Sequence, residues 1–413
     1  MLVSIYVKER NRVPRHRFQG FETITPAGWG LPWPLGSETA IDRLDITVGE
    51  LLDRVRQSVY GFVLGLYDEE VGALRHFYRA DTRQWGAFDS GNFLMALNFV
   101  VAADVFNDPT MLERASRCFH YAVEHFCETH PMAFWQGGVR DGQERHELWL
   151  KYTGDAMWLA QALYRRTRDP SPVQALQMFH SFCKRAREAG YRYVFDRRRY
   201  QWRDVGNVWR AFGFPVTAYL ELYELTGEER YRQAAIDWGG AGLTLQADDG
   251  LFYLIDGVFW NSDLTAPELR GLVYLWEVTG VSRYLDAAVR FADQVVKLQR
   301  ADGSWPLGVD RDGEVSIATI GPGDAPNIAL SLIRLHGATG DDRYLDAATK
   351  AVRYGMQLQA LPGGKYPLWL DDPHVCGGFW SWDPLYDHTL SGDQSIHHIR
   401  GMLFLASYLD ALT

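Results

Sequence analysis

The sequence predicts an all-α protein, an (α/α)6 barrel or six-hairpin toroid, formed by one domain over residues 1–413. Three observations predict this fold. A helix-joining motif recurs along the chain, six aspartates recur at similar intervals, and the helical stretches alternate in character. Self-similarity at a regular period is the signature of a repeat architecture, in which each unit buries its apolar face against the next.

The joining motif is clearest in three segments that read LTGEERYRQAA, VTGVSRYLDAA and ATGDDRYLDAA. Their tyrosines, Tyr231, Tyr284 and Tyr344, are 53 and 60 residues apart. In each segment the glycine after threonine supplies the left-handed C-cap that ends one helix, and the next helix starts shortly afterwards. Weaker joints at residues 107–109 and 167–170 continue the series towards the N-terminus.

A second series lies about half a period away from these joints. Six aspartates each precede an apolar helical stretch: Asp89, Asp155, Asp204, Asp263, Asp324 and Asp393. These stretches are apolar nearly all round, as expected of helices buried on both sides. The helices between them carry a charged stripe at helical spacing, which is typical of an outer ring. Six buried and six amphipathic helices in alternation describe a closed double ring.

The connections between the predicted helices are of two kinds. Joints from a buried to an amphipathic helix are short, whereas the opposite joints are long and rich in Trp, Gly, Pro, Asp and His. Binding residues usually lie in long loops on one face of a rigid scaffold. Nine of the 15 tryptophans fall in these loops: Trp85, Trp135, Trp149, Trp202, Trp260, Trp305, Trp369, Trp380 and Trp382. The buried helices also point their N-termini at this face, which favours an anion at the mouth.

Composition narrows the classes of partner. A net charge of −10 argues against a nucleic-acid partner, although a local pocket can still hold a small anionic ligand. No apolar run approaches the ~20 residues that span a bilayer. The N-terminus does not read as a secretory signal, because its short apolar patch precedes its charges. We therefore expect a cytoplasmic protein without a membrane partner, with residues 1–45 as an N-terminal extension packed on the barrel. A homodimer is left open.

The cysteines and the short motifs predict neither a metal nor a cofactor. Cys118, Cys127, Cys183 and Cys376 show no CxxC pairing, so we expect free, mostly buried thiols. His374 and Cys376 could ligate zinc, but no third and fourth ligands follow at a recognisable spacing. The chain also contains no phosphate loop, dinucleotide fingerprint or nucleophile elbow.

Two aspartates at the predicted mouth are candidate acid/base groups. Asp89 lies in WGAFDSGN and Asp155 follows Trp149 in HELWLKYTGD, so both have aromatic and polar neighbours. Two carboxylates at one rim are the minimal set for general acid/base work on a glycosidic bond. The alternative is that each aspartate is only a helix N-cap. That interpretation is favoured for Asp263 and Asp324, although Asp324 stays a binding candidate.

Aromatic residues and histidines near these acids predict a sugar-binding surface. Tryptophans hold sugar rings by flat apolar contact, although some of them serve only to close the barrel. His146, His388, His397 and His398 lie near the same rim. Because His397 and His398 fall inside the last buried helix, at least one of them is expected to be a satisfied core histidine. His388, in the loop WDPLYDHTLSGD, is the better functional candidate.

These segments resemble the six-hairpin glycosidases, especially the unsaturated glucuronyl and rhamnogalacturonyl hydrolases of glycoside hydrolase families 88 and 105. FDSGN with Asp89 resembles the stretch around the family's first catalytic aspartate, and YTGDAMWLAQALY with Asp155 resembles the helix start that bears its second. GNVWRAFGFPVTAYLELYELTGEERY is similar to the family's Arg-Gly-Gln-Ala-Trp helix, and GPGDAPNIALSLIRL to its late Tyr-Gly-Asp helix start. The likeness covers residues 85–340. Two positions depart from it, since Val205 replaces an arginine and Phe88 a histidine.

The resemblance implies a reaction on an unsaturated uronic acid at the end of an oligosaccharide. Asp155 would protonate the C4–C5 double bond and activate water, while Asp89 would hold hydroxyl groups and adjust the acidity of Asp155. Trp202 and Trp209 would stack on the sugar ring. The other candidate substrate-binding residues are Arg203, Arg210, His146, His388, Trp149 and Asp324.

Two other functions remain open on the same scaffold. A uronate lyase or a sugar epimerase would use a Tyr/His pair in place of two aspartates, and Tyr386 with His388 could supply it. A non-catalytic toroid would bind a glycan or a protein and would need no acid/base residue.

Overall fold

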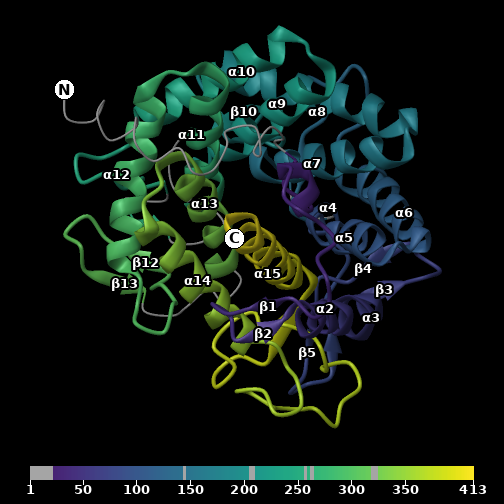
Figure 1. Ribbon diagram of the computed structural model, residues 1–413. Coiled ribbons are helices and arrows are strands. Elements are labelled where there is room, and N and C mark those ends of the chain that lie inside the picture. Colours follow the sequence, from purple (N-terminus) through teal and green to yellow (C-terminus); the bar gives the residue numbers. More distant parts are fainter. Residues whose placement is uncertain (1–21, 143–145, 204–209, 255–257, 261–264, 318–323) are drawn as a thin grey trace.

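Two concentric rings of helices form the molecule in the computed structural model, which describes residues 22–142, 146–203, 210–254, 258–260, 265–317 and 324–413 (Figure 1). The predicted (α/α)6 toroid is confirmed. The inner ring consists of α4 (Asn92–Met95) with α5 (Leu97–Phe106), α7 (Leu150–Thr167), α9 (Gly213–Thr226), α11 (Thr265–Thr279), α13 (Asp324–Thr339) and α15 (Gly392–Leu412). Each inner helix packs against the next, and α15 closes the ring on α4 and α5.

The outer ring has a continuous first helix followed by five regular ones. The first runs through α2 (Val48–Arg56), the π-helical stretch η3 (Gln57–Val63) and α3 (Leu64–Leu66). The others are α6 (Pro109–Phe126), α8 (Pro170–Glu188), α10 (Glu229–Leu243), α12 (Ser282–Leu298) and α14 (Asp342–Gln357). Their charged stripe faces outwards, as the alternation in the sequence predicted.

The short joints all lie at one end of the barrel and share one geometry. Each inner helix from α5 to α13 ends at a residue in the left-handed region, with φ of 53° to 71°. Thr167, Thr226, Thr279 and Thr339 then act alike, since each hydroxyl accepts the N–H two residues later. Such a hydrogen bond fixes the turn, and the left-handed residue ends the helix.

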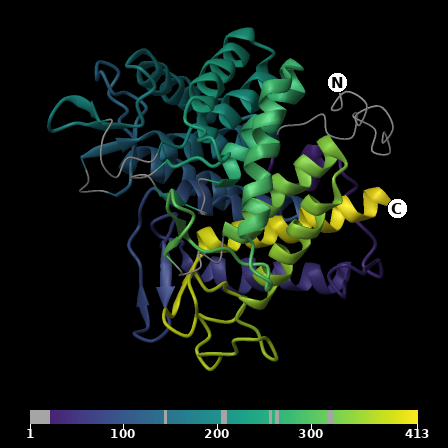
Figure 2. The same cartoon turned by 90° about the vertical axis from the view of Figure 1, so that its left-hand side faces the viewer.

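The long connections carry the strands and meet at the other end of the barrel (Figure 2). One antiparallel sheet, in the order β14-β5-β6, joins the last loop to the first through β14 (Thr389–Ser391), β5 (Phe77–Arg79) and β6 (Gln84–Trp85). A second, in the order β10-β9-β8-β7, contains β7 (Val139–Arg140), β8 (Glu147–Trp149), β9 (Val194–Asp196) and β10 (Gln201–Arg203). A third contains β11 (Phe259–Trp260), β12 (Gly308–Val309) and β13 (Val315–Ile317).

Two short hairpins complete the strands, and the N-terminal segment covers the short-joint end. The hairpins are β1 (Ala40–Ile41) with β2 (Ile46–Thr47) and β3 (Tyr67–Asp68) with β4 (Ala73–Leu74). Before them, the turn η2 (Pro26–Trp29) buries Trp29 against Phe404, with ring centroids 4.3 Å apart. Arg400 Nε donates to the Thr23 carbonyl at 2.7 Å. Residues 22–29 thus pack on the barrel, while residues 1–21 lie outside the described part. The extension over residues 1–45 stays a prediction.

The aspartate series marks the inner helices, but not always as caps. Asp89 precedes α4 by three residues and Asp324 is the first residue of α13. Asp155 lies in the second turn of α7, and Asp393 follows the first residue of α15, whose N-cap is Ser391. The N-cap interpretation is therefore wrong for Asp155 and Asp393. Asp204 and Asp263 lie outside the described residues.

Two further expectations concern the thiols and the membrane. All four cysteines are free, and Cys118, Cys127 and Cys183 are buried, as predicted. Burial raises the pKa of each of these three thiols. Among the described helices, none is both long and apolar enough to cross a bilayer.

Candidate functional site

A cavity of about 580 Å³ opens at the long-loop end, where the first and last loops pair. The pairing of β14 with β5 places the start of α15 beside the residues that precede α4. Aromatic rings and polar groups share its wall, which is the composition expected of a saccharide site. The lining residues are His76, Phe77, Arg79, Gln84, Trp85, Asp89, Ser381, Trp382, Thr389, Ser391, Asp393 and Gln394.

His76 and Asp89 form an ion pair in the wall of this cavity. His76 Nδ1 lies 2.8 Å from Asp89 Oδ2, and Asp89 Oδ1 accepts the Gly91 N–H at 2.9 Å. A Cβ on Gly91 would lie 2.9 Å from both Asp89 Oδ1 and His76 Nδ1, so the glycine of FDSGN leaves room for the pair. Asp89 therefore both fixes the turn before α4 and holds a histidine.

The charge of this pair follows from its surroundings. Burial lowers the pKa of His76, but the hydrogen bond and charge of Asp89, with the charges of Asp393 and Asp141, outweigh it and raise the pKa to about 9. His76 is therefore protonated at neutral pH, between carboxylates. Sequence reasoning missed His76, because no motif contains it and only strand pairing brings it to Asp89.

A second polar layer lies inside the barrel, below the cavity. Asp155, Arg270 and His397 are each the sixth residue of α7, α11 and α15, which alternate around the inner ring. All three are buried, with 4% of each residue exposed. His397 Nε2 lies 3.8 Å from Asp393 Oδ1, and Asp393 also lines the cavity. The lumen and the cavity are thus neighbouring parts of one polar region.

The two adjacent histidines of α15 differ in role. His398 stacks on Phe379 with ring centroids 4.2 Å apart and planes 5° apart, so it is the core histidine that the sequence predicted. His397 instead belongs to the lumen layer. Burial, with the charges of Arg400, Lys151 and Arg270, lowers the pKa of His397 well below its usual value, so the imidazole is neutral.

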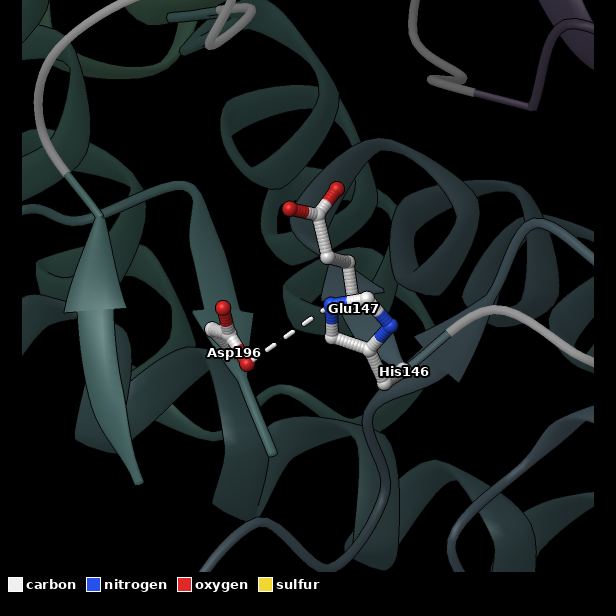
Figure 3. A group of neighbouring side chains, drawn as sticks. All are labelled: His146, Glu147 and Asp196. Atoms are coloured by element: carbon white, nitrogen blue, oxygen red, sulfur yellow. Dashed lines mark ion pairs between the residues drawn. The ribbon is translucent and has the colours of Figure 1, made fainter. Parts of the chain in front are cut away.

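A third polar group lies on the sheet formed by β7 to β10 (Figure 3). Ligand-type atoms of His146, Glu147 and Asp196 lie within 4.8 Å of one another, which is close enough to hold a cation. Arg203 forms an ion pair with Glu147, and His146 Nε2 lies 3.9 Å from Asp196 Oδ1. Asp196 Oδ1 also accepts the backbone N–H of Arg198 at 2.9 Å. A guanidinium thus already supplies positive charge to these carboxylates, and the expectation of no metal stays a prediction.

The remaining candidates occupy several places on the long-loop end. Trp202 packs on Phe182 and Phe195, with centroids 5.3 and 5.2 Å away. The ring centroids of His388 and Trp369 are 5.5 Å apart, and His388 Nδ1 lies 3.7 Å from Asp81 Oδ2.

Trp149 ends β8 directly before α7, and Arg210 is exposed just before α9. Tyr386, the alternative partner of His388, is 85% exposed. Trp209 and Val205 lie outside the described residues, as does the side chain of Asp324. The structure thus gathers Asp89 with His76 and Arg203 with Glu147 beside His146, and buries Asp155 in the second turn of α7.

Comparison with known proteins supports the fold rather than a family. No family model matches the sequence, and no curated protein matches it. A D-mannose isomerase has a TM-score of 0.69 at 13% identity, covering 89% of this chain and 98% of that chain. Cellobiose 2-epimerase from Spirochaeta thermophila has a TM-score of 0.66 at 16% identity, covering 88% and 97%.

A third neighbour is a hydrolase. An inactive variant of a family 76 α-1,6-mannanase from Salegentibacter sp., with two aspartates replaced by asparagine, was solved with α-1,6-mannotriose. Its TM-score is 0.56 at 14% identity, covering 87% of this chain and 99% of that chain. These neighbours share the six-hairpin toroid with this chain, and none of the three is named as a member of family 88 or 105.

Proposed function

We propose that this chain is a carbohydrate-active enzyme that hydrolyses a glycosidic bond in an oligosaccharide containing an unsaturated uronic acid. The observation that supports this most is the ion pair of Asp89 and His76 in a cavity that also holds Asp393 and two tryptophan rings. Carboxylates next to aromatic faces suit a sugar, because rings stack on apolar surfaces while hydroxyl groups bond to acids.

The proposed chemistry uses the lumen acid and the cavity acid differently. Asp155 donates a proton to C4 of the unsaturated ring, water adds at C5 as it returns a proton to Asp155, and the hemiketal then opens with loss of the sugar. Asp89, paired with the protonated His76, holds hydroxyl groups of the ring. A buried acid of this kind typically contributes ~10²–10⁴-fold to the rate.

A sugar epimerase or isomerase is the second candidate, and two observations favour it. The isomerase and epimerase neighbours superpose with TM-scores of 0.66 to 0.69, above the 0.56 to 0.58 of the family 76 hydrolases. In addition, His397 is a neutral imidazole beside the cavity, and a neutral imidazole can take a proton from the carbon next to a carbonyl.

Proton NMR in D2O separates the two candidates in one experiment. The purified chain is incubated with an unsaturated glucuronyl disaccharide, α-1,6-mannobiose, cellobiose and D-mannose, in separate tubes. Hydrolysis of the uronide removes the C4 vinyl proton signal and produces a new reducing end. Epimerisation instead exchanges the C2 proton of the reducing sugar for deuterium, and isomerisation of an aldose to a ketose removes that proton and adds deuterium at C1. Neither reaction cleaves a glycosidic bond. An untouched uronide together with a cleaved mannobiose would overturn the uronide assignment, and no change in any tube would overturn both reactions.

A further inference from the structure

Two arginines meet one tryptophan in the lumen. Arg270 lies at the level of Asp155 and His397, while Trp158 and Arg400 follow Asp155 and His397 by three residues, about one turn further along their helices. The guanidinium carbon of Arg400 lies 4.4 Å from the Trp158 ring centroid, and that of Arg270 lies 6.0 Å from it. These residues come from α15, α11 and α7, which alternate around the inner ring, so their contacts cross the barrel. Trp158 is only partly buried although it lies in the third turn of an inner helix. Because both guanidinium groups lie over its ring, the indole borders the space between α7, α11 and α15.

These two guanidinium groups differ from the other buried arginines in having no carboxylate partner among the described residues. Arg400 donates through Nε to a carbonyl, whereas its Nη1 and Nη2 have no hydrogen-bond partner; nor do Nε and Nη1 of Arg270. By contrast, the buried Arg334 forms an ion pair with Glu277 at 2.7 Å, and the partly buried Arg166 forms one with Asp104 at 2.6 Å.

Three acids act on the two arginines through their charges, and none of them forms an ion pair with either one among the described residues. Glu22 pairs with Arg166 at 2.9 Å. Burial raises the pKa of Glu221 to about 8, against the charges of Arg165 and Arg270, so this carboxyl is mostly protonated at neutral pH. Glu268 uses Oε1 to accept the Gly213 N–H at 3.1 Å. A buried charge without a hydrogen-bonded counterion is costly, and native proteins normally pair it. An anion in the lumen would pair both arginines.

We infer that Arg270 and Arg400 bind a carboxylate group of the substrate beside Trp158. The guanidinium fork suits a planar carboxylate, and the exposed indole suits the apolar face of the ring that bears it. The ligand is therefore an acidic sugar that enters from the cavity and reaches the lumen past Asp155 and His397. This inference rests on the proposed function only for the placing of a sugar in this region. The two arginines would also bind the substrate carboxylate, which Val205, in place of the family's arginine, cannot do.

Binding measurements on the intact chain test the inference without requiring turnover. Isothermal titration compares D-glucuronate with D-glucuronamide, which has the same shape but no charge. We expect the acid to bind roughly ten- to a hundred-fold more tightly, because hydrogen bonds to a charged group are stronger. Arg270→Met should remove most of this preference while keeping weak binding of the amide. Arg165→Met, at a partly buried arginine that pairs with Glu224, is the matched control and should keep the preference.

Equal binding of acid and amide by the wild-type chain would overturn the inference, as would an unchanged preference in Arg270→Met. Acetate that competes as well as glucuronate would also overturn it, because the site would then take any small anion. Arg400→Met could fail to fold, because Arg400 also holds the N-terminal segment. In that case the comparison of glucuronate with glucuronamide on the wild-type chain still tests the inference. A preference for the acid without hydrolysis of any uronide supports this site and rejects the proposed reaction. Hydrolysis of a uronide without tighter binding of the acid than of the amide supports the proposed reaction and rejects this carboxylate site.

Discussion

The two ends of the barrel are built from the same helices but in opposite ways. At the short-joint end, five connections repeat one geometry, with a left-handed residue followed by an extended one. At the long-loop end each connection differs in length, strand content and sequence, and the polar groups gather there and in the adjoining lumen.

The difference separates what stability requires from what binding requires. The short joints satisfy helix ends locally, through threonine hydroxyls and left-handed caps, so any sequence that supplies these groups will serve. The long-loop end carries a histidinium between carboxylates, and the lumen below it carries a buried arginine pair. Such arrangements cost stability unless a ligand or a precise contact offsets them. Changes at the two ends should therefore affect different properties.

The largest effect is expected in the lumen. Asp155→Asn should keep the fold and ligand binding but reduce turnover of the true substrate by at least ~100-fold, since it removes the proposed proton donor. Steady-state kinetics with calorimetric Tm measurements test this. Asp286→Asn, the same exchange on the exposed face of outer helix α12, is the control and should change neither quantity. Full turnover by Asp155→Asn would remove this residue from the mechanism.

A smaller, pH-dependent effect is expected at the cavity. Because Asp89 raises the folded-state pKa of His76 from 6.5 to about 9, the stability from protonated His76 is complete below about pH 6.5 and lost as the pH rises through about 9. Asp89→Asn should therefore lower Tm most below pH 6.5, with the deficit shrinking towards pH 9 and above. NMR titration of the His76 ring checks the cause directly. A deficit that grows with pH would contradict the ion pair.

The smallest effect is expected at the short-joint end. Gly227 has φ of 70°, and no atom lies within 4 Å of the position that a Cβ would take there, so Gly227→Ala adds only backbone strain. We expect a loss of about 1 kcal/mol in stability with unchanged turnover. Arg168→Gly makes the reverse exchange at a residue with φ of 58° and should not lower Tm. Reduced turnover in Gly227→Ala would show that the two ends are coupled.

The sequence by itself determined the double ring, because helix period, apolar content and caps are local properties. The threonine-glycine joints located the ends of α9, α11 and α13, and the weaker joints at Asn107 and Arg168 adopt the same left-handed conformation. The sequence also placed Asp89 at the mouth of the barrel, because the segment FDSGN combines a turn with a carboxylate. The alternative interpretation of Asp155 as an N-cap was wrong by nearly two helical turns, because the helix extends back to Leu150 and its N-cap is Trp149.

Only the tertiary structure decided which distant groups meet. His76 lies beside Asp89 because the antiparallel pairing of β5 with β6 continues to a bridge between Arg75 and Phe88. The pairing of β5 with β14, which closes the ring between the first and last loops, brings Ser391 and Asp393 to the same cavity. Arg270 and Arg400 stood in stretches that read as apolar, and nothing local shows that both face Trp158 across the barrel. Side chains in the lumen come from helices more than a hundred residues apart, and their packing is set by the radius of the closed ring rather than by neighbours in the chain.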